Sequence, residues 1–106
     1  MARYDFIAVY MLANKRNGTL YLGVTSDLFT RIVLHREGRE QGFAQRHGCK
    51  TLVWYERLAY MREAIDRETQ LKHWLRKWKI ALIEKDNPQW LDLYPKLFEP
   101  PHYPKR

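Results

Sequence analysis

Residues Tyr4 to Val24 read YDFIAVYMLANKRNGTLYLGV, and this segment specifies the first part of the fold. Residues 6–13 carry apolar side chains at both odd and even positions, so a strand here is expected to be covered on both faces. Asn17-Gly18 follows, and this dipeptide favours a two-residue hairpin turn because both central positions of a type I′ turn need a positive φ. We therefore predict an antiparallel hairpin whose returning strand spans residues 19–24.

The register of this hairpin places two phenols on one face. A two-residue loop pairs Arg16 with Thr19, so even positions of the first strand share a face with odd positions of the second, and any even loop length keeps this parity. Tyr10 and Tyr21 then lie on one face with Gly23 between them, where the missing side chain leaves a gap. The gap is either part of a site or a tyrosine-lined core with a glycine bulge.

The rest of the chain predicts helices around a third strand. Thr25-Ser26-Asp27 offers helix-capping side chains and Gly38 a stop, which indicates a helix over about 27–37. Residues 41–50 are expected to be a polar loop and residues 51–58 a strand. The inward side chains expected on the first helix are Leu28, Ile32 and Val33.

Residues 61–85 are expected to form two helices that break near Trp74. Asn87-Pro88 is expected to open a last short helix, because Asn is a good N-cap and Pro suits the first helical position. We expect one domain over residues 1–98 and an extended or disordered tail over 99–106. The apolar stripe predicted for the two long helices consists of Met61, Ala64, Ile65, Leu71, Leu75, Trp78, Leu82 and Ile83.

Charge and composition limit the possible partners. Lys and Arg outnumber Asp and Glu by 19 to 12 in 106 residues, which gives a formal net charge of +7. Such an excess attracts polyanions, chiefly nucleic acid or an anionic membrane, unless it is only a solvated basic surface. We expect no membrane partner, because no apolar run approaches the ~18 residues of a membrane span. The lone cysteine, Cys49, and the lack of signal-peptide regions at the N-terminus favour the cytoplasm.

Two further groups of residues are candidates for chemistry. Asp27, Arg31 and His35 recur every four residues on the first helix, and an Arg with a His suits a phosphate; the alternative is a solvated face with an Asp27–Arg31 ion pair. Glu68 lies in an apolar helical stripe, where a carboxylate needs either a cation such as Mg²⁺ or a salt bridge to Arg67, Arg31 or Lys72.

Taken in order, these pieces resemble the GIY-YIG nuclease superfamily. The resemblance rests on Ala8-Val9-Tyr10, then Tyr21-Leu22-Gly23, then Arg31 and His35, and finally Glu68 on a later helix. It spans about residues 6–93 and is closest to the small stand-alone single-domain bacterial branch. Ala8-Val9 replaces Gly-Ile and Leu22 replaces Ile of the name motif, while both tyrosines and the glycine remain.

The resemblance implies an α+β fold, with a three-stranded antiparallel sheet flanked by helices. It also implies an endonuclease that hydrolyses DNA phosphodiester bonds with one divalent metal ion, Mg²⁺ or Mn²⁺, held by Glu68. Tyr10 is the leading candidate to take a proton from the attacking water, and Tyr21 would orient that water. A phenol is a weak acid, so a role as base requires a nearby cation, which Arg31 would supply while also stabilising the transition state.

The remaining residues have less definite roles in this resemblance. His35 would position the nucleophile or relay the proton, and Gly23 is structural at the site. Asn87 occupies the place of a polar residue found late in the family, although a helix cap explains it equally well. The side chains expected to contact the phosphate backbone are Arg36, Arg46, Lys72 and Arg76, and RNA is not excluded as the substrate. Two alternatives are a nucleic-acid-binding module that kept the fold without catalysis and a structural or protein-interaction domain; an oligomeric state is not indicated.

Overall fold

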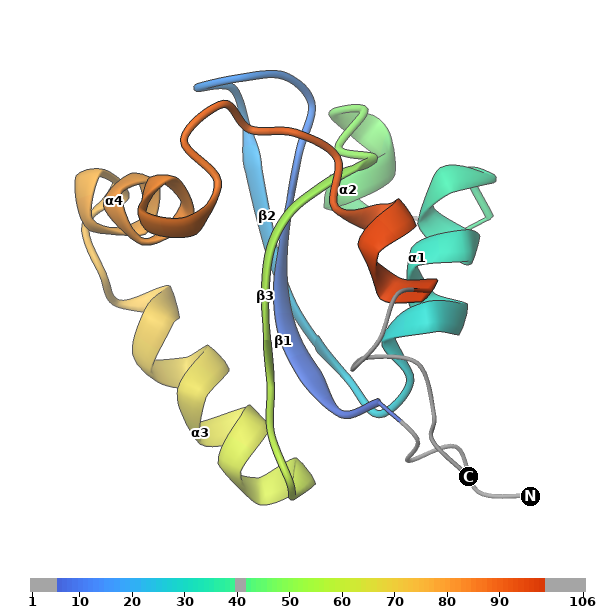
Figure 1. Cartoon of the computed structure of the whole chain (residues 1–106), viewed down its shortest axis with the longest axis vertical. Coiled ribbons are helices and arrows are strands. Elements are labelled where there is room, and N and C mark those ends of the chain that lie inside the picture. The colour runs from blue at the N-terminus through green and yellow to red at the C-terminus, as the bar shows by residue number, and fades with distance from the viewer. Residues whose placement is uncertain (1–5, 40–41, 99–106) are drawn as a thin grey trace.

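The computed structural model describes residues 6–39 and 42–98, and Figure 1 shows a sheet with helices on both sides. The three strands form one antiparallel sheet in the order β2-β1-β3, which confirms the predicted α+β class. In chain order the elements are β1 (Ala8–Ala13), β2 (Leu20–Thr25), α1 (Leu28–Arg36), α2 (Phe43–Arg46), β3 (Thr51–Arg57), α3 (Met61–Lys72), α4 (Arg76–Asp86) and the 3-10 helix η1 (Tyr94–Phe98).

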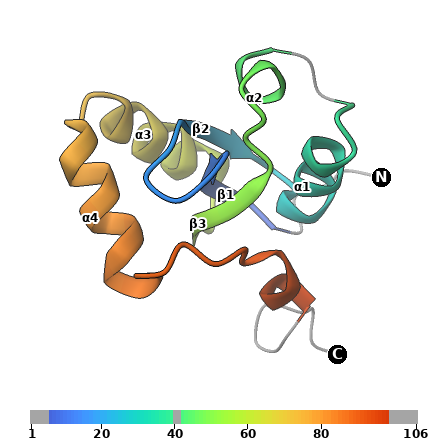
Figure 2. The same ribbon diagram turned by 90° about the horizontal axis from the view of Figure 1, so that it is seen from above.

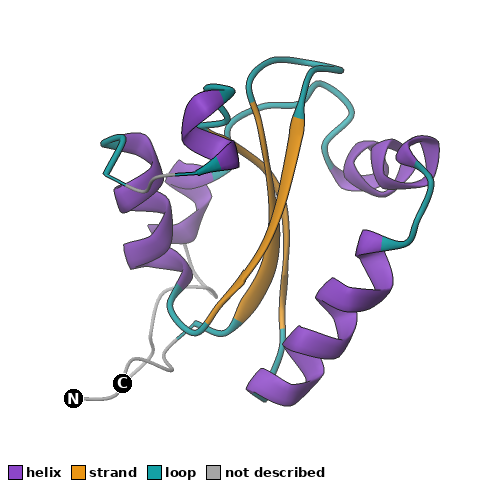
Figure 3. Ribbon diagram, turned by 180° about the vertical axis from the view of Figure 1, so that it is seen from behind, coloured by secondary structure: helices purple, strands orange, loops and turns teal. Residues whose placement is uncertain are grey.

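The central strand β1 is buried along its whole length, as its two-sided apolar pattern predicts. Its even positions pack into one hydrophobic cluster with α1, α2 and η1. Its odd positions pack into a second cluster with α3 and α4. Figures 1 and 3 show these two helical layers on opposite sides of the sheet. The fold therefore has two cores separated by a sheet, and side chains of one strand reach both.

The β1–β2 hairpin differs from the predicted two-residue turn. Residues 15–18 form the loop, because the Asn14 amide donates to the Thr19 carbonyl at 3.3 Å and the Gly18 amide to the Lys15 carbonyl at 2.9 Å. The Asn14 side chain also accepts from the Thr19 amide at 2.9 Å, which closes the loop one pair earlier than predicted. The loop length is still even, so Tyr10 lies opposite Gly23 and the predicted face parity is confirmed.

Helix α1 begins as the capping pattern predicts. Asp27 is its N-cap and accepts from the Thr30 amide at 3.4 Å, and Gly38 follows its end with a φ of 71°. Leu28 and Ile32 are buried, but the third buried side chain is His35 in place of the predicted Val33, which is only partly buried. The inward face is therefore rotated toward Tyr10, which lies beneath it.

The predicted polar loop over 41–50 is wrong in part, because residues 43–46 form α2. Ala44 and Cys49 join the cluster beneath α1, and the Cys49 amide donates to the Ala44 carbonyl at 2.8 Å. Burial of these two small side chains in a mostly polar stretch holds the short helix in place.

The break between α3 and α4 lies at the predicted Trp74, but the predicted stripe is too wide. Ala64 and Leu71 are fully buried, whereas Ile65, Leu75 and Trp78 are exposed. The narrow buried face of α3 packs against β1 and β2.

Asn87 ends α4 and does not begin a new helix, so the helix predicted from Asn87-Pro88 is wrong. The last helical segment of the described chain is η1. The predicted tail, 99–106, lies outside the described residues.

Candidate active site

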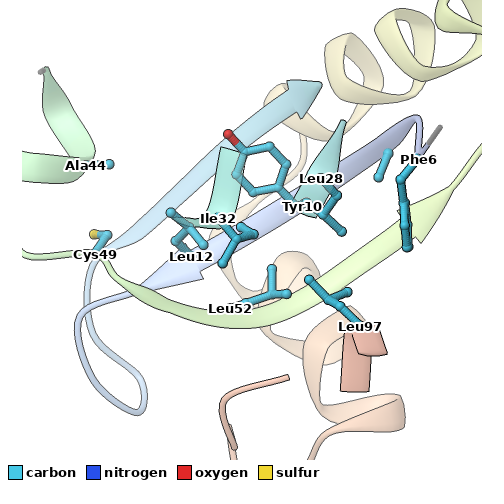
Figure 4. Close-up of a cluster of buried hydrophobic side chains, with 10 residues drawn as sticks. Phe6, Tyr10, Leu12, Leu28, Ile32, Ala44, Cys49, Leu52 and Leu97 are labelled. Atoms are coloured by element: carbon cyan, nitrogen blue, oxygen red, sulfur yellow. The ribbon is translucent and has the colours of Figure 1, made fainter. Parts of the chain in front are cut away.

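The centre of the candidate site is a buried pair formed by a phenol and an imidazole. The Tyr10 hydroxyl and the His35 Nε2 are 3.2 Å apart, and both side chains are buried. β1 places Tyr10 on the face that α1 covers, and His35 lies in the last turn of that helix. Figure 4 shows the Tyr10 hydroxyl over β2, away from Leu52 and Leu97. The two polar groups satisfy each other, and the tautomer of His35 decides which one donates.

Tyr21 on β2 completes an aromatic cluster with this pair. Its ring centroid lies 6.2 Å from that of Tyr10 and 5.5 Å from that of His35. The strand register places Tyr21 opposite Leu12 and therefore diagonal to Tyr10, on the same face, as predicted. Tyr21 is only partly buried, so it is the member of the cluster that reaches solvent.

Gly23 provides the space that the Tyr10 phenol occupies. A Cβ at this position would lie 2.6 Å from both the Cζ and the hydroxyl oxygen of Tyr10. The β1–β2 register is continuous through this pair, so the glycine-bulge interpretation is wrong here. The gap expected between the tyrosines is therefore filled by Tyr10 itself.

Arg31 lies one helical turn before His35 on α1 and is partly buried. The Asp27 carboxylate accepts from the backbone amide of Thr30 at 3.4 Å and from its hydroxyl at 2.8 Å. Asp27 therefore acts as a helix cap. The i, i+4 spacing keeps Arg31 on the His35 side of the helix.

Glu68 lies on α3, which covers the opposite face of the sheet from α1. Its side chain is 13% exposed and forms an ion pair with the Lys72 Nζ at 3.1 Å, one of the partners expected from the sequence. α3 packs against β2, the edge strand that carries Tyr21. Convergence of Glu68 with the tyrosine cluster stays a prediction, and such a site has to straddle the edge of β2.

The cations expected to contact nucleic acid are spread over the molecule. Arg36 forms an ion pair with Asp92 at 2.5 Å and lies over the Tyr94 ring at 4.4 Å, which ties α1 to the C-terminal segment. Arg46 is exposed at the end of α2, and the Lys72 side chain is 59% exposed.

Arg76 holds the hairpin loop through one guanidinium nitrogen. Its Nη2 donates to the carbonyl oxygens of Asn17 and Gly18 at 2.8 and 2.7 Å. Arg76 therefore fixes the loop that leads into β2.

Asn87 has a structural role in the described part of the chain. Its buried side-chain amide donates to the carbonyl oxygens of Val53 and Leu91 at 3.0 and 2.9 Å, and its Oδ1 accepts from the Leu91 amide at 3.0 Å. These bonds join the end of α4 to β3. The predicted N-cap role is therefore wrong, and Asn87 holds two segments together.

A cavity of about 330 Å³ opens beside the start of β2, and sequence reasoning missed it. Phe43 lines it from α2, a helix that the sequence did not predict, while Arg76 and Lys79 line it from α4. Thr19 and Leu20 form the remaining wall. The one signal available in the sequence was a large aromatic residue within an otherwise polar stretch.

The residues present limit how a metal ion would bind. Among residues 6–39 and 42–98, no three His, Cys, Asp or Glu side chains come together. An ion at Glu68 would therefore take most of its ligands from water and phosphate oxygens, as Mg²⁺ commonly does, so the residues fit an ion that binds together with substrate. Burial raises the pKa of the Cys49 thiol, which disfavours the thiolate that binds metals.

No helix in the described part of the chain is long and apolar enough to cross a membrane.

The fold has a counterpart among solved structures. It is similar to the solution NMR structure of the UPF0213 protein BH0048 from Bacillus halodurans, with a TM-score of 0.52 and 24% identity, over 90% of this chain and 97% of that one. This similarity supports the arrangement of the sheet and helices.

Sequence relatives and a family model agree with that fold. The chain is 35% identical to a UPF0213 protein of Bacillus pumilus, over 65% of this chain and 70% of that protein. It is 36% identical to the UPF0213 protein CPE1444 of Clostridium perfringens, over 71% of this chain and 80% of that one. The model of the GIY-YIG catalytic domain matches residues 6–81, a range that contains both tyrosines, Arg31, His35 and Glu68. The chain therefore belongs to the GIY-YIG family.

Proposed function

We propose that this protein is a metal-dependent endonuclease that hydrolyses the phosphodiester bonds of DNA. The observation that carries the proposal is the contact between the Tyr10 hydroxyl and the His35 Nε2, with the partly exposed Tyr21 beside it. A buried phenol bonded to an imidazole can move a proton, and the net charge of +7 favours a polyanionic substrate.

The phenol–imidazole pair supports a proton relay. When the His35 Nε2 is unprotonated, the Tyr10 hydroxyl donates to it. As the attacking water forms its bond to phosphorus, its proton passes to the Tyr10 oxygen, and the phenol proton passes to His35. The phosphorus–oxygen bond to the leaving group breaks, and the leaving oxygen takes a proton from solvent. Tyr21, at the solvent side of the cluster, orients the water.

Arg31 supplies positive charge to the phosphate in this proposal. Its guanidinium presents two parallel donors that match two phosphate oxygens, and the negative charge on those oxygens grows in the transition state. Arg31 precedes His35 by one turn, so this cation shares α1 with the histidine of the relay.

Glu68 is the proposed ligand of one Mg²⁺ or Mn²⁺ ion. When bound, such an ion neutralises charge on the scissile phosphate and on the leaving oxygen. The Lys72 ammonium now balances the Glu68 carboxylate at 3.1 Å, so lysine and cation compete for the same oxygens. Since Lys72 is largely exposed, it can release Glu68 at a small energetic cost.

A cleavage assay tests this function. Supercoiled plasmid, branched DNA and a single-stranded RNA are incubated with the protein in Mg²⁺, in Mn²⁺ and in EDTA. We expect metal-dependent cleavage of DNA by the wild type, and losses of roughly 10²-fold or more for Tyr10→Phe, His35→Ala and Arg31→Ala. Tyr60→Phe is the matched control, because Tyr60 is exposed at the N-terminus of α3.

A non-catalytic nucleic-acid-binding module is the second candidate. The observation that favours it is that Tyr10 and His35 already satisfy each other in the core and need no substrate to do so. It predicts salt-dependent binding of DNA without cleavage under any of the metal conditions. That result would remove the nuclease proposal.

We also infer that the protein acts in the cytoplasm of a bacterium. The single cysteine, Cys49, is buried and forms no disulfide, which suits a reducing compartment, and the relatives are bacterial proteins.

A further inference from the structure

The cavity beside the start of β2 lies across the free edge of the sheet. Phe43 reaches it from α2, on one face of the sheet, and Arg76 and Lys79 reach it from α4, on the other. Figure 2 shows the β1–β2 loop between these two helices. β2 is an edge strand of the three-stranded sheet, and the outer side of such a strand can pair with an elongated partner.

Phe43 presents an aromatic surface at the mouth of the cavity. It is 43% exposed, and the His47 ring stacks against it with centroids 4.2 Å apart and an angle of 23° between the planes. The His47 Nδ1 lies 3.0 Å from the Phe43 carbonyl oxygen, which holds the stack in one orientation. A fixed, exposed aromatic pair of this kind is suited to stacking against a nucleobase.

Two cations face this aromatic surface across the cavity. Carbonyl oxygens of the hairpin loop hold the Arg76 guanidinium in place, and Lys79 is partly buried in the opposite wall. The described residues that line the cavity include no carboxylate. A ligand with both an anionic group and a flat aromatic group complements these walls, and a nucleotide has both.

We propose that this cavity binds one unpaired nucleotide of the substrate strand, with its base stacked on Phe43 and its phosphate between Arg76 and Lys79. The proposal rests on the nuclease function above and adds a preference for single-stranded or frayed DNA. Thr19, on the cavity wall, precedes Tyr21 by two residues, so the nucleotide lies roughly 7 Å along the strand from the aromatic cluster. A strand that follows the edge of β2 reaches both.

Fluorescence anisotropy in EDTA measures this binding apart from cleavage. The probes are a labelled ten-nucleotide oligo-dT and a labelled DNA duplex of the same length. Phe43→Ala should weaken binding of oligo-dT by roughly 5- to 100-fold, and Phe43→Trp should restore it. Lys79→Ala should lower the slope of log affinity against log salt by about 0.7.

Matched controls make the result specific. Tyr60→Ala removes an aromatic side chain that is 68% exposed, and Lys85→Ala removes an exposed lysine at the other end of α4; neither should change binding. Equal affinities for Phe43→Ala and Tyr60→Ala would overturn the proposal. It would also fail if Phe43→Ala weakened duplex binding as much as binding of oligo-dT, or if the wild type did not bind oligo-dT.

The same proteins are then assayed on plasmid with Mg²⁺. Loss of oligo-dT binding in Phe43→Ala, with a wild type that cuts nothing, would retain the nucleotide site and reject the nuclease. If the wild type cleaves plasmid and the Phe43→Ala variant binds oligo-dT as tightly as the wild type, the nuclease proposal is retained and the nucleotide site is rejected.

Discussion

Replacement of Gly23 by alanine tests whether the close approach of Tyr10 to β2 builds the candidate site. The added Cβ would lie 2.6 Å from two atoms of the Tyr10 phenol, a separation that real side chains do not tolerate. β1 is the central strand and is buried throughout, so the phenol can yield only by rotating away from β2. In the wild type the Tyr10 hydroxyl lies 3.2 Å from the His35 Nε2. The rotation would move the hydroxyl away from that nitrogen and break the contact.

Two terms set the expected size of the effect. Forcing an extra methyl group into a packed core costs about 1–3 kcal/mol. Loss of the hydrogen bond between Tyr10 and His35 adds about 1 kcal/mol. We therefore expect Gly23→Ala to lower the free energy of unfolding by about 2–4 kcal/mol, which corresponds to a fall in Tm of roughly 10–20 °C for a domain of this size.

A double-mutant cycle separates the clash from other effects of the substitution. Tyr10→Leu removes the phenol atoms that the new Cβ would meet. In that background Gly23→Ala should be neutral or stabilising, because alanine restricts the unfolded chain and fills the space. Urea denaturation of the four proteins gives the coupling energy, and plasmid cleavage by Gly23→Ala below its melting temperature should fall by roughly 10²-fold.

An additive cycle would rule out a clash between Tyr10 and the new Cβ. If Gly23→Ala costs the same with tyrosine or leucine at position 10, contact between the phenol and β2 is not the cause. If the Gly23→Ala variant is destabilised but cleaves plasmid at the wild-type rate, Tyr10 and His35 do not need their observed contact for catalysis.

Three further predictions concern other parts of the chain. Glu68→Ala should abolish metal-dependent cleavage and change the free energy of unfolding by no more than about 0.5 kcal/mol, because its partner Lys72 is largely exposed; a large loss of Tm with cleavage retained would make Glu68 structural. Asn87→Ala should destabilise the protein by about 2–4 kcal/mol in urea, since it leaves the Val53 carbonyl and both backbone groups of Leu91 without these partners, yet cleavage at low temperature should persist. Burial raises the pKa of the Cys49 thiol, so iodoacetamide at about pH 8 should alkylate the native protein far more slowly than the urea-unfolded one; equal rates would contradict the buried placement.

Local patterns predicted the parts of the fold that depend on near neighbours. The two-sided apolar pattern of residues 6–13 indicated a strand covered on both faces, and parity placed Tyr10 and Tyr21 on one face even though the loop was longer than predicted. Asp27 and Gly38 bounded α1, because capping is an interaction within a few residues. Gly23 was recognised as unusual, but the atoms that require a glycine belong to Tyr10, on another strand.

Features that depend on distant partners did not follow from those patterns. The short helix α2 exists because Ala44 and Cys49 enter a core built by other elements, and nothing in residues 41–50 signals that burial. Likewise Asn87 precedes a proline, as a helix N-cap often does, yet its side-chain amide donates to the carbonyl oxygen of Val53 on β3.

Strand and helix periods in the sequence were enough to assign the two tyrosines to one face and Arg31 and His35 to one stripe. The fold class followed from the order of these motifs, which resembles that of the GIY-YIG superfamily. Only the tertiary structure decided that His35 turns inward to meet the Tyr10 hydroxyl, and that Glu68 lies on the helical layer across the sheet with Lys72 as its partner. These outcomes depend on which layers pack against which face of β1. Periodicity repeats along one element and carries no information about the element it will meet.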